Sequence, residues 1–426
     1  MKTTEYTLDN GLRVIHQEKE GSKMVDVKII LGAGNFYNNY YGYKPGVAHF
    51  LEHVVHEKTE KYQNKKDLTS ILTDYGGVRN AATSSIERMS FYATVLEEFA
   101  ESACDYISQV VFHSKFDQVA VDKHRKIITE ELLASFKKSG TKVSNLFNEL
   151  ALAETDFKFH TLGTEESLKE ITLEDLQRFY NERFVAQNCI LSISGDITIE
   201  KCKELSNKYF INIRESTALN SLTHIENLDT KKIPPITLKK QGYVSVPEKQ
   251  AVVSFGTITK GRDDPRYFAL KILLDFLTNS SNSILNIRLR EENSLLYNIS
   301  SIFYTNQLFG YVYFSLNVQP SNIQQCLDII KHEIKEVSDG KITDIELSQT
   351  KKKSEASEIF YNQSIQDESF AYANLRLLFT NVTNQNEFLQ KILAVTKEEV
   401  IEAAKWLSQN LNILAVCSNE EQKYDF

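Results

Sequence analysis

Apolar positions along the chain predict an alternation of short strands and helices. Apolar runs bounded by turn residues indicate strands at residues 12–16, 25–31, 89–95 and 189–194. Helical periodicity indicates helices that begin near Val47 and recur at residues 65–75, 98–112, from about 117 into the 140s, and 172–181. Four glycines and Pro45 between the second strand and the first helix predict a loop over residues 32–46.

The second half of the chain repeats this order of elements. Residues 214–240 are polar, lack a clear period and contain Pro234-Pro235, which predicts a linker. Beyond the linker, strands are indicated at residues 250–256, 297–304, 310–318 and 411–417, with helices at 265–277 and within 323–409. The sequence therefore predicts an α+β fold with two copies of one unit, residues 1–213 and 241–426. Each unit is expected to hold an antiparallel sheet with helices on one face.

Composition narrows the class of protein. The chain has 426 residues, 42% of them hydrophobic and 25% charged, as in soluble globular proteins. Its formal net charge of −8 argues against nucleic-acid binding, which normally needs a basic face. The five cysteines include no C-x-x-C pair, so neither a disulfide framework nor a thiolate zinc site is indicated. No apolar signal peptide or membrane span is visible, and a cytoplasmic location is expected.

The segment His49-Phe50-Leu51-Glu52-His53 has the strongest chemical signal. Two histidines four residues apart on a helix share one face, and two imidazoles at that spacing can bind one Zn²⁺ ion. Glu52 adjoins them, where a carboxylate can act as general base on zinc-bound water. This H-x-x-E-H order inverts the H-E-x-x-H of other zinc peptidases. Such a histidine pair is also common on ordinary helix surfaces, so the pentapeptide alone leaves the metal site undecided.

A catalytic zinc site needs a third protein ligand, and a carboxylate from another helix would supply it. Glu130 and Glu131 are adjacent candidates, and they point about 100° apart around a helix. Ile127 and Leu133 look like core positions, but this spacing does not choose between the two glutamates. An exposed acidic pair without a metal is the ordinary alternative.

Together these residues resemble the family of pitrilysin, insulin-degrading enzyme and the mitochondrial processing peptidase. The resemblance covers nearly the whole chain. It includes the H-x-x-E-H segment and several landmarks: Leu8-Asp9-Asn10-Gly11-Leu12, Gly76-Gly77, Asn80-Ala81-Ala82-Thr83, Leu162-Gly163, Ile171-Thr172, Gly195-Asp196, Arg290-Glu291 and Tyr297. The resemblance implies a two-unit chain that forms half of a clamshell, and a zinc-dependent endopeptidase activity.

The family pattern E-R-x-x-I-x-x-E ends on the third zinc ligand. Aligned without gaps, that pattern falls on residues 124–131 and places the ligand at Glu131. The usual distance from the second histidine favours Glu130 instead, which stays as the alternative. The chain departs from the pattern at His124, where the family has a glutamate that supports catalysis beside the metal. This departure puts the activity of the isolated chain in question.

The resemblance also implies residues that act on the substrate. Arg290 and Tyr297 match a pair that reaches the substrate backbone and the developing oxyanion. Asn80 and Ala81 match a strand edge that pairs with an extended peptide. By composition alone, Arg290 would be an ordinary surface residue and Tyr297 a core residue.

A full chamber in this family contains four units, so the resemblance implies a homodimer or a heterodimer with a related chain. The expected substrates are peptides or unfolded precursor segments, and a ribosomally made peptide is one analogy. The rival hypothesis is a non-catalytic or partner-dependent subunit of a heterodimeric peptidase. No motif indicates a third alternative, a small-molecule metallohydrolase.

Overall fold

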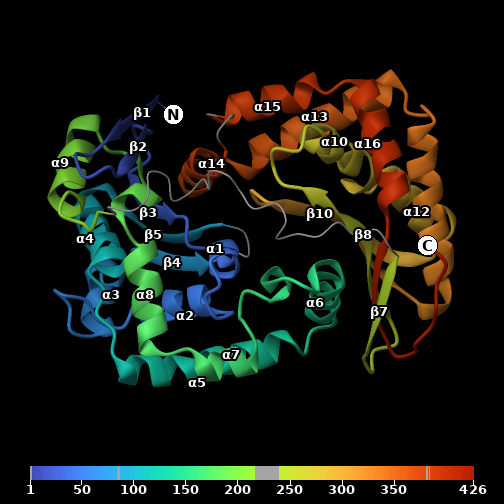
Figure 1. Cartoon of the computed structure of the whole chain (residues 1–426). Coiled ribbons are helices and arrows are strands. Elements are labelled where there is room, and N and C mark those ends of the chain that lie inside the picture. The colour runs from blue at the N-terminus through green and yellow to red at the C-terminus, as the bar shows by residue number, and fades with distance from the viewer. Residues whose placement is uncertain (1, 84–86, 216–238, 380–381, 383) are drawn as a thin grey trace. The chain divides into compact units, whose positions relative to one another are not determined.

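The computed structural model describes residues 2–83, 87–215, 239–379, 382 and 384–426 (Figure 1). Most of the linker predicted for residues 214–240 therefore lies outside the described residues. The chain forms two compact units, and each is built from several segments. Unit 1 comprises Met1–Leu132, His160–Asn227 and Tyr361–Gln385, and unit 2 comprises Leu133–Phe159, Leu228–Phe360 and Asn386–Phe426.

Unit 1 contains a six-stranded sheet with the order β1-β2-β6-β3-β5-β4. Its strands are β1 (Lys2–Thr7), β2 (Arg13–Glu18), β3 (Met24–Leu31), β4 (Val78–Thr83), β5 (Met89–Leu96) and β6 (Cys189–Gly195). β6 lies between β2 and β3, which run in opposite directions. It therefore pairs antiparallel with β3 and parallel with β2. This one parallel pair departs from the purely antiparallel sheet that the sequence predicts.

Unit 2 contains a five-stranded sheet with the order β7-β11-β8-β10-β9. Its strands are β7 (Lys240–Ser245), β8 (Ala251–Lys260), β9 (Leu296–Thr305), β10 (Phe309–Val318) and β11 (Ile413–Ser418). The last strand, β11, again lies between the first two and pairs parallel with β7. Apart from β1, the two sheets have the same order and the same parallel pair, as expected for two copies of one unit.

The two halves of the chain exchange a helix. In the first half, α5 (Gln118–Ser135) is followed by α6 (Ser139–Leu152), and in the second half α13 (Asp344–Tyr361) is followed by α14 (Ile365–Leu378). α6 packs on β7, β8 and β11 in unit 2, whereas α14 packs on β3 and β6 in unit 1. The compact units therefore differ from a simple division of the chain at the predicted linker.

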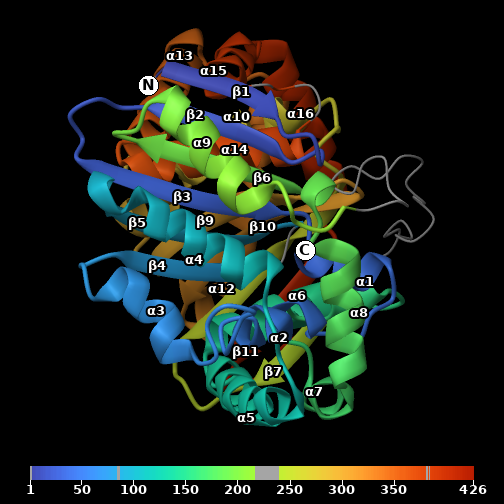
Figure 2. The ribbon, with the colours of Figure 1, turned by 90° about the vertical axis from the view of Figure 1, so that its left-hand side faces the viewer.

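Helices cover both faces of the first sheet. α4 (Ala100–Phe112) packs on β3 and β5, and Figure 2 shows it in front of the sheet with α14 behind. Leu377 of α14 joins a buried cluster with Ile15, Ile30 and Ile190 on the rear face. Alternate residues of β3, such as Val27 and Ile29, are fully buried as well. The sequence predicts helices on only one face of the sheet. In the structure the opposite face is covered as well, by α14 from the second half of the chain.

The remaining helices belong to one or the other half of the chain. In the first half they are α1 (Asn35–Tyr40), α2 (Val47–Val54), α3 (Lys65–Thr73), α7 (Glu165–Glu170), α8 (Leu173–Arg183) and α9 (Ile199–Phe210). In the second half they are α10 (Tyr267–Thr278), α11 (Ile284–Asn286), α12 (Ile323–Ser338), α15 (Gln385–Ala394) and α16 (Lys397–Asn410). Two local predictions were wrong: α1 interrupts the loop predicted for residues 32–46, and the helix predicted from 117 into the 140s breaks between α5 and α6.

All five cysteines are free and buried, as expected from their scattered positions. Within the described part of the chain, none of the helices combines the length and the apolar character needed to cross a membrane.

Candidate metal centre

Helix α2, which contains the two histidines of the motif, is a buried element of unit 1. Its side chains Val47, Phe50, Leu51 and Val54 are fully buried, and it packs against α8 and the edge strand β4. At its start, the buried Asn38 side chain accepts a hydrogen bond from the Ala48 backbone N–H. The apolar surroundings fix the helix, so the face on which each polar side chain lies is fixed too.

Close backbone contact anchors the beginning of α2. Gly46 and Gly163 both have positive φ, +91° and +78°, and their loops meet without intervening side chains. A Cβ atom on Gly163 would lie 2.5 Å from the Pro45 carbonyl oxygen, and one on Gly46 would lie 2.9 Å from that of Leu162. The Leu162-Gly163 landmark is therefore a structural requirement of the turn that precedes the histidine helix.

Replacing Gly163 with alanine is expected to destabilise unit 1. The left-handed backbone costs about 1 kcal/mol with a Cβ atom, and overlap with Pro45 adds about 1–3 kcal/mol. Urea unfolding of the metal-free protein measures the change in the free energy of unfolding. Gly21→Ala is the matched control, because Gly21 has φ +76° and no atom within 4 Å of the added Cβ. Equal losses of stability in the two variants would contradict the view that the close contact of Gly163 with Pro45 anchors the start of α2.

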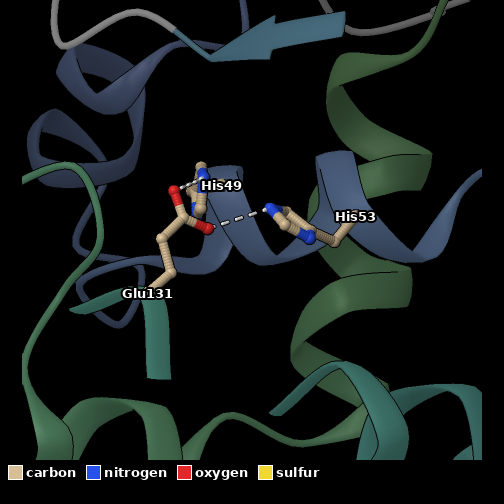
Figure 3. A group of neighbouring side chains, drawn as sticks. All are labelled: His49, His53 and Glu131. Atoms are coloured by element: carbon tan, nitrogen blue, oxygen red, sulfur yellow. Dashed lines mark ion pairs between the residues drawn. The ribbon is translucent and has the colours of Figure 1, made fainter. Parts of the chain in front are cut away.

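Helix α5 brings Glu131 to the two histidines (Figure 3). The Glu131 Oε1 atom lies 3.8 Å from His49 Nε2, and Oε2 lies 3.5 Å from His53 Nε2. The centres of the two imidazole rings are 4.7 Å apart. The three ligand atoms all lie within 4.8 Å of one another, and this is the one such cluster found among the described residues. Glu130 does not take part in it.

The donor set fits a zinc ion. Two imidazole nitrogens and one carboxylate form one of the common ligand sets of catalytic zinc, with a fourth position left open. Tetrahedral bonds of about 2.0–2.1 Å place neighbouring ligand atoms about 3.3 Å apart, so the distances of 3.8 and 3.5 Å from Glu131 to the two histidines need only a small contraction. The His49 side chain is 10% exposed, that of His53 23% and that of Glu131 47%, so the cluster opens on the side of the carboxylate.

Burial keeps both histidines neutral, which is the form that binds metal. It lowers the pKa of His49 to about 3, with smaller contributions from His53 and His160. It lowers the pKa of His53 to about 4, helped by His124 and Lys65. The pKa of Glu131 is raised, again by burial.

The metal-free protein is expected to lose stability as the pH falls below about 6.5. Burial also lowers the pKa of His56 to about 3, so His49, His53 and His56 stay neutral in the folded state while the unfolded chain takes up protons at each. At pH 5 this costs up to about 2 kcal/mol per histidine. Urea unfolding of the chelator-treated protein at pH 7 and at pH 5 measures this loss of stability. Stability that is unchanged or higher at pH 5 would contradict the expectation.

His124 lies beside the cluster and is paired with a carboxylate. Its ring is 5.8 Å from that of His53 in an edge-to-face arrangement, and its Nε2 atom is 2.8 Å from Glu57 Oε1. Burial lowers the pKa of His124. The pKa of Glu57 is also lowered: burial acts to raise it, but hydrogen bonds from Lys123 and His124 outweigh burial. The neutral ring of His124 thus contacts both His53 and the charged carboxylate of Glu57.

The other residues predicted for unit 1 lie close to the cluster in the fold. Glu52 is partly exposed on α2, between the two histidines. Asn80 and Ala81 lie on β4, the edge strand that packs against α2, and pair with Tyr92 and Phe91 of β5 on one side. The exposed side of β4 is therefore an edge beside the histidine helix.

Arg290 and Tyr297 belong to unit 2. Arg290 lies in a π-helical turn, Ile287–Glu292, and its guanidinium carbon is 5.6 Å from the centre of the Tyr297 ring. Tyr297 is 74% exposed, so it is not the core residue that composition alone would suggest. The structure brings these two residues together at the start of β9.

Two supporting residues were missed by sequence reasoning. The Arg125 side chain stacks on Phe50 of α2 and donates hydrogen bonds to the carbonyl groups of Leu168 and Ile171, which ties α5 to the α7–α8 connection. Glu57 lies four residues after His53, a spacing that could have indicated a shared face had α2 been expected to continue.

Comparisons with known proteins agree with this architecture. Residues 13–165 match the family profile described as insulinase (peptidase family M16), and residues 170–354 match the profile described as the peptidase M16 inactive domain. An uncharacterized zinc protease, YmxG, of Bacillus subtilis is 24% identical over 97% of both chains. The mitochondrial-processing peptidase subunit beta of Dictyostelium discoideum is 25% identical over 65% of this chain and 57% of its own length.

Solved structures share the fold along nearly the full length. A protease from Helicobacter pylori has a TM-score of 0.85 at 18% identity and covers 98% of this chain and 99% of its own. A peptidase M16 inactive domain from Pseudomonas fluorescens has a TM-score of 0.85 at 17% identity, with 99% and 100% covered. With two M16 profiles matched in succession, relatives named as zinc proteases and the same two-unit fold, the chain belongs to the insulinase family of peptidases, family M16.

Proposed function

We propose that the chain is a zinc-dependent endopeptidase that cleaves peptides or unfolded protein segments. The observation that carries the proposal is the cluster of His49, His53 and Glu131, which lies on α2 and α5 in the unit that contains the exposed edge of β4. The relatives named as zinc proteases support the same metal and the same class of reaction.

In the proposed mechanism, His49, His53 and Glu131 hold the metal. A bound zinc ion would supply a Lewis acid that polarises the scissile carbonyl and makes water acidic enough to lose a proton near neutral pH. Glu52, adjacent to His53, accepts that proton as general base and returns it to the leaving amine as general acid.

The substrate would bind as an added strand. Asn80 and Ala81 offer backbone groups along the edge of β4, and main-chain pairing tolerates many sequences. Only a segment without its own tertiary structure can present such a strand, which is why peptides and unfolded precursors are the proposed substrates. Arg290 and Tyr297 supply a charged donor and a phenol donor for the substrate backbone and the developing oxyanion.

A dimer, of identical chains or with a related chain, is part of the proposal. The mitochondrial relatives are named as subunits, which supports an assembly. The alternative is a non-catalytic or partner-dependent subunit, and two observations favour it: the substitution at His124 and the match to a profile described as inactive. That profile covers residues 170–354, however, whereas the cluster lies in the part that matches the insulinase profile.

Cleavage assays on the purified chain test the proposal. An unstructured peptide library should be cut, a folded protein of similar composition should not, and a chelator should abolish cleavage until zinc is restored. Cleavage that resists the chelator would overturn the proposal. Cleavage that appears only after a second, related chain is added would favour the partner-dependent alternative.

A further inference from the structure

The segment that follows α2 places a carboxylate against His124, the residue whose ring meets that of His53. Glu57 lies just beyond the end of α2, and its backbone N–H donates to the Val54 carbonyl group. Its side chain is only 16% exposed, and both carboxylate oxygens have partners. Oε1 is 2.8 Å from His124 Nε2, and Oε2 is 2.8 Å from Lys123 Nζ. A partly buried carboxylate with charge-assisted bonds to both oxygens is held in one position.

His124 connects this carboxylate to the cluster. It lies seven residues before Glu131 on α5, so the two side chains share one face of the helix. The His124 side chain is 5% exposed, and its ring meets that of His53 edge to face at 5.8 Å. Because Nε2 of His124 faces Glu57, the hydrogen bond fixes the plane of the His124 ring, and that ring limits the rotation of the His53 imidazole.

We infer that Glu57 is a positioning residue of the metal centre, which acts through His124 to hold the His53 imidazole. This inference rests on the proposed function. Carboxylates behind ligating histidines set the ring orientation and raise the basicity of the ligand. In this chain the carboxylate comes from the α2 side, whereas the family pattern has it at position 124. The pair Glu57–His124 would then compensate for the departure at His124.

Zinc affinity of the metal-free chain, measured by competition with a chromogenic chelator, tests the inference without an activity assay. Glu57→Gln is expected to weaken zinc binding by about tenfold or more. The matched control is Glu60→Gln, because Glu60 also pairs with a histidine, His113, and a lysine, Lys115, but on the surface and outside the cluster. This control should bind zinc like the wild type.

Exchanging the side chains of Glu57 and His124 tests whether the pair positions the metal centre or only packs in the fold. His124→Glu alone sets two carboxylates against each other and Glu57→His alone sets two imidazoles together, so each single variant should bind zinc more weakly. The double variant restores a Glu–His pair in reverse order and should recover most of the affinity, which a double-mutant cycle measures. Urea unfolding of each metal-free variant monitors the fold.

The outcomes distinguish the inference from the proposed function. A wild-type chain that fails to bind zinc would overturn the proposed function and the inference with it. A wild-type chain that binds zinc, with Glu57→Gln equal to Glu60→Gln, would overturn the inference alone. So would weaker binding in Glu57→Gln that the exchange does not recover and that parallels a loss of stability, because that result assigns Glu57 a structural role only.

Discussion

Replacing Glu52 with glutamine is expected to reduce the turnover number for peptide cleavage by a factor of roughly 10² to 10⁴. The amide has nearly the same shape as the carboxylate but cannot accept a proton from water. Because Glu52 is not part of the ligand cluster, zinc content should stay at the wild-type level. Steady-state kinetics on a fluorogenic peptide, with metal analysis of the same samples, measure both quantities.

The split between turnover and metal content makes this variant informative. Loss of both together would mean that Glu52 supports the fold or the metal rather than the proton transfer. Cleavage at the wild-type rate would contradict the role of Glu52 as general base.

Replacing Glu131 with glutamine is expected to weaken zinc binding by more than about 100-fold and to abolish cleavage at low zinc concentrations. Its carboxylate oxygens face both histidines, at 3.8 and 3.5 Å. Glu130→Gln is a stringent control, because it removes the same charge one residue away on an exposed face of the same helix. Zinc titrations of both chelator-treated variants give the comparison.

Equal effects in the two variants would point to a general electrostatic contribution of the acidic pair. A larger effect in Glu130→Gln would contradict the geometry of the cluster.

The histidine helix could be predicted from the sequence because its signal is local. Four residues span slightly more than one helical turn, so His49 and His53 share a face whatever the rest of the chain does. Most strands and helices were predicted for the same reason. β1 and β7 were missed, because each lies at the side of its sheet, has only exposed or half-buried residues and lacks an apolar run.

The choice between the two glutamates could not be made from helical spacing because two positions on α5 were misread. Ile127 and Leu133, which look like core residues, are 45% and 39% exposed. The buried stripe instead runs through Val121, His124, Ile128 and Leu132. Because a histidine interrupts this stripe, the sequence does not show the stripe as an apolar pattern. Glu131 lies at the edge of the stripe. The resemblance predicted Glu131 as the ligand from the local pattern of residues, without knowledge of which side chains of α5 are buried.

Long-range pairings were also beyond the sequence. Glu57 and His124 are 67 positions apart, and no sequence pattern predicts a contact between the two. The exchange of α6 and α14 between the two halves of the chain could not be predicted either, because the pattern of an amphipathic helix does not determine which of two similar sheets it covers. Both features depend on the tertiary arrangement, which local periodicity does not encode.

Metal stoichiometry of the purified chain tests the central claim most directly. The chain would be prepared without chelator and, in parallel, stripped with chelator and titrated with zinc, beside the variants His53→Ala and Glu131→Gln. We predict one tightly bound zinc ion per wild-type chain, recovery of cleavage when the stripped protein is titrated, and no comparable binding in either variant. A wild-type chain that binds no zinc, or variants that bind it equally well, would contradict the assignment of His49, His53 and Glu131 as a catalytic zinc site.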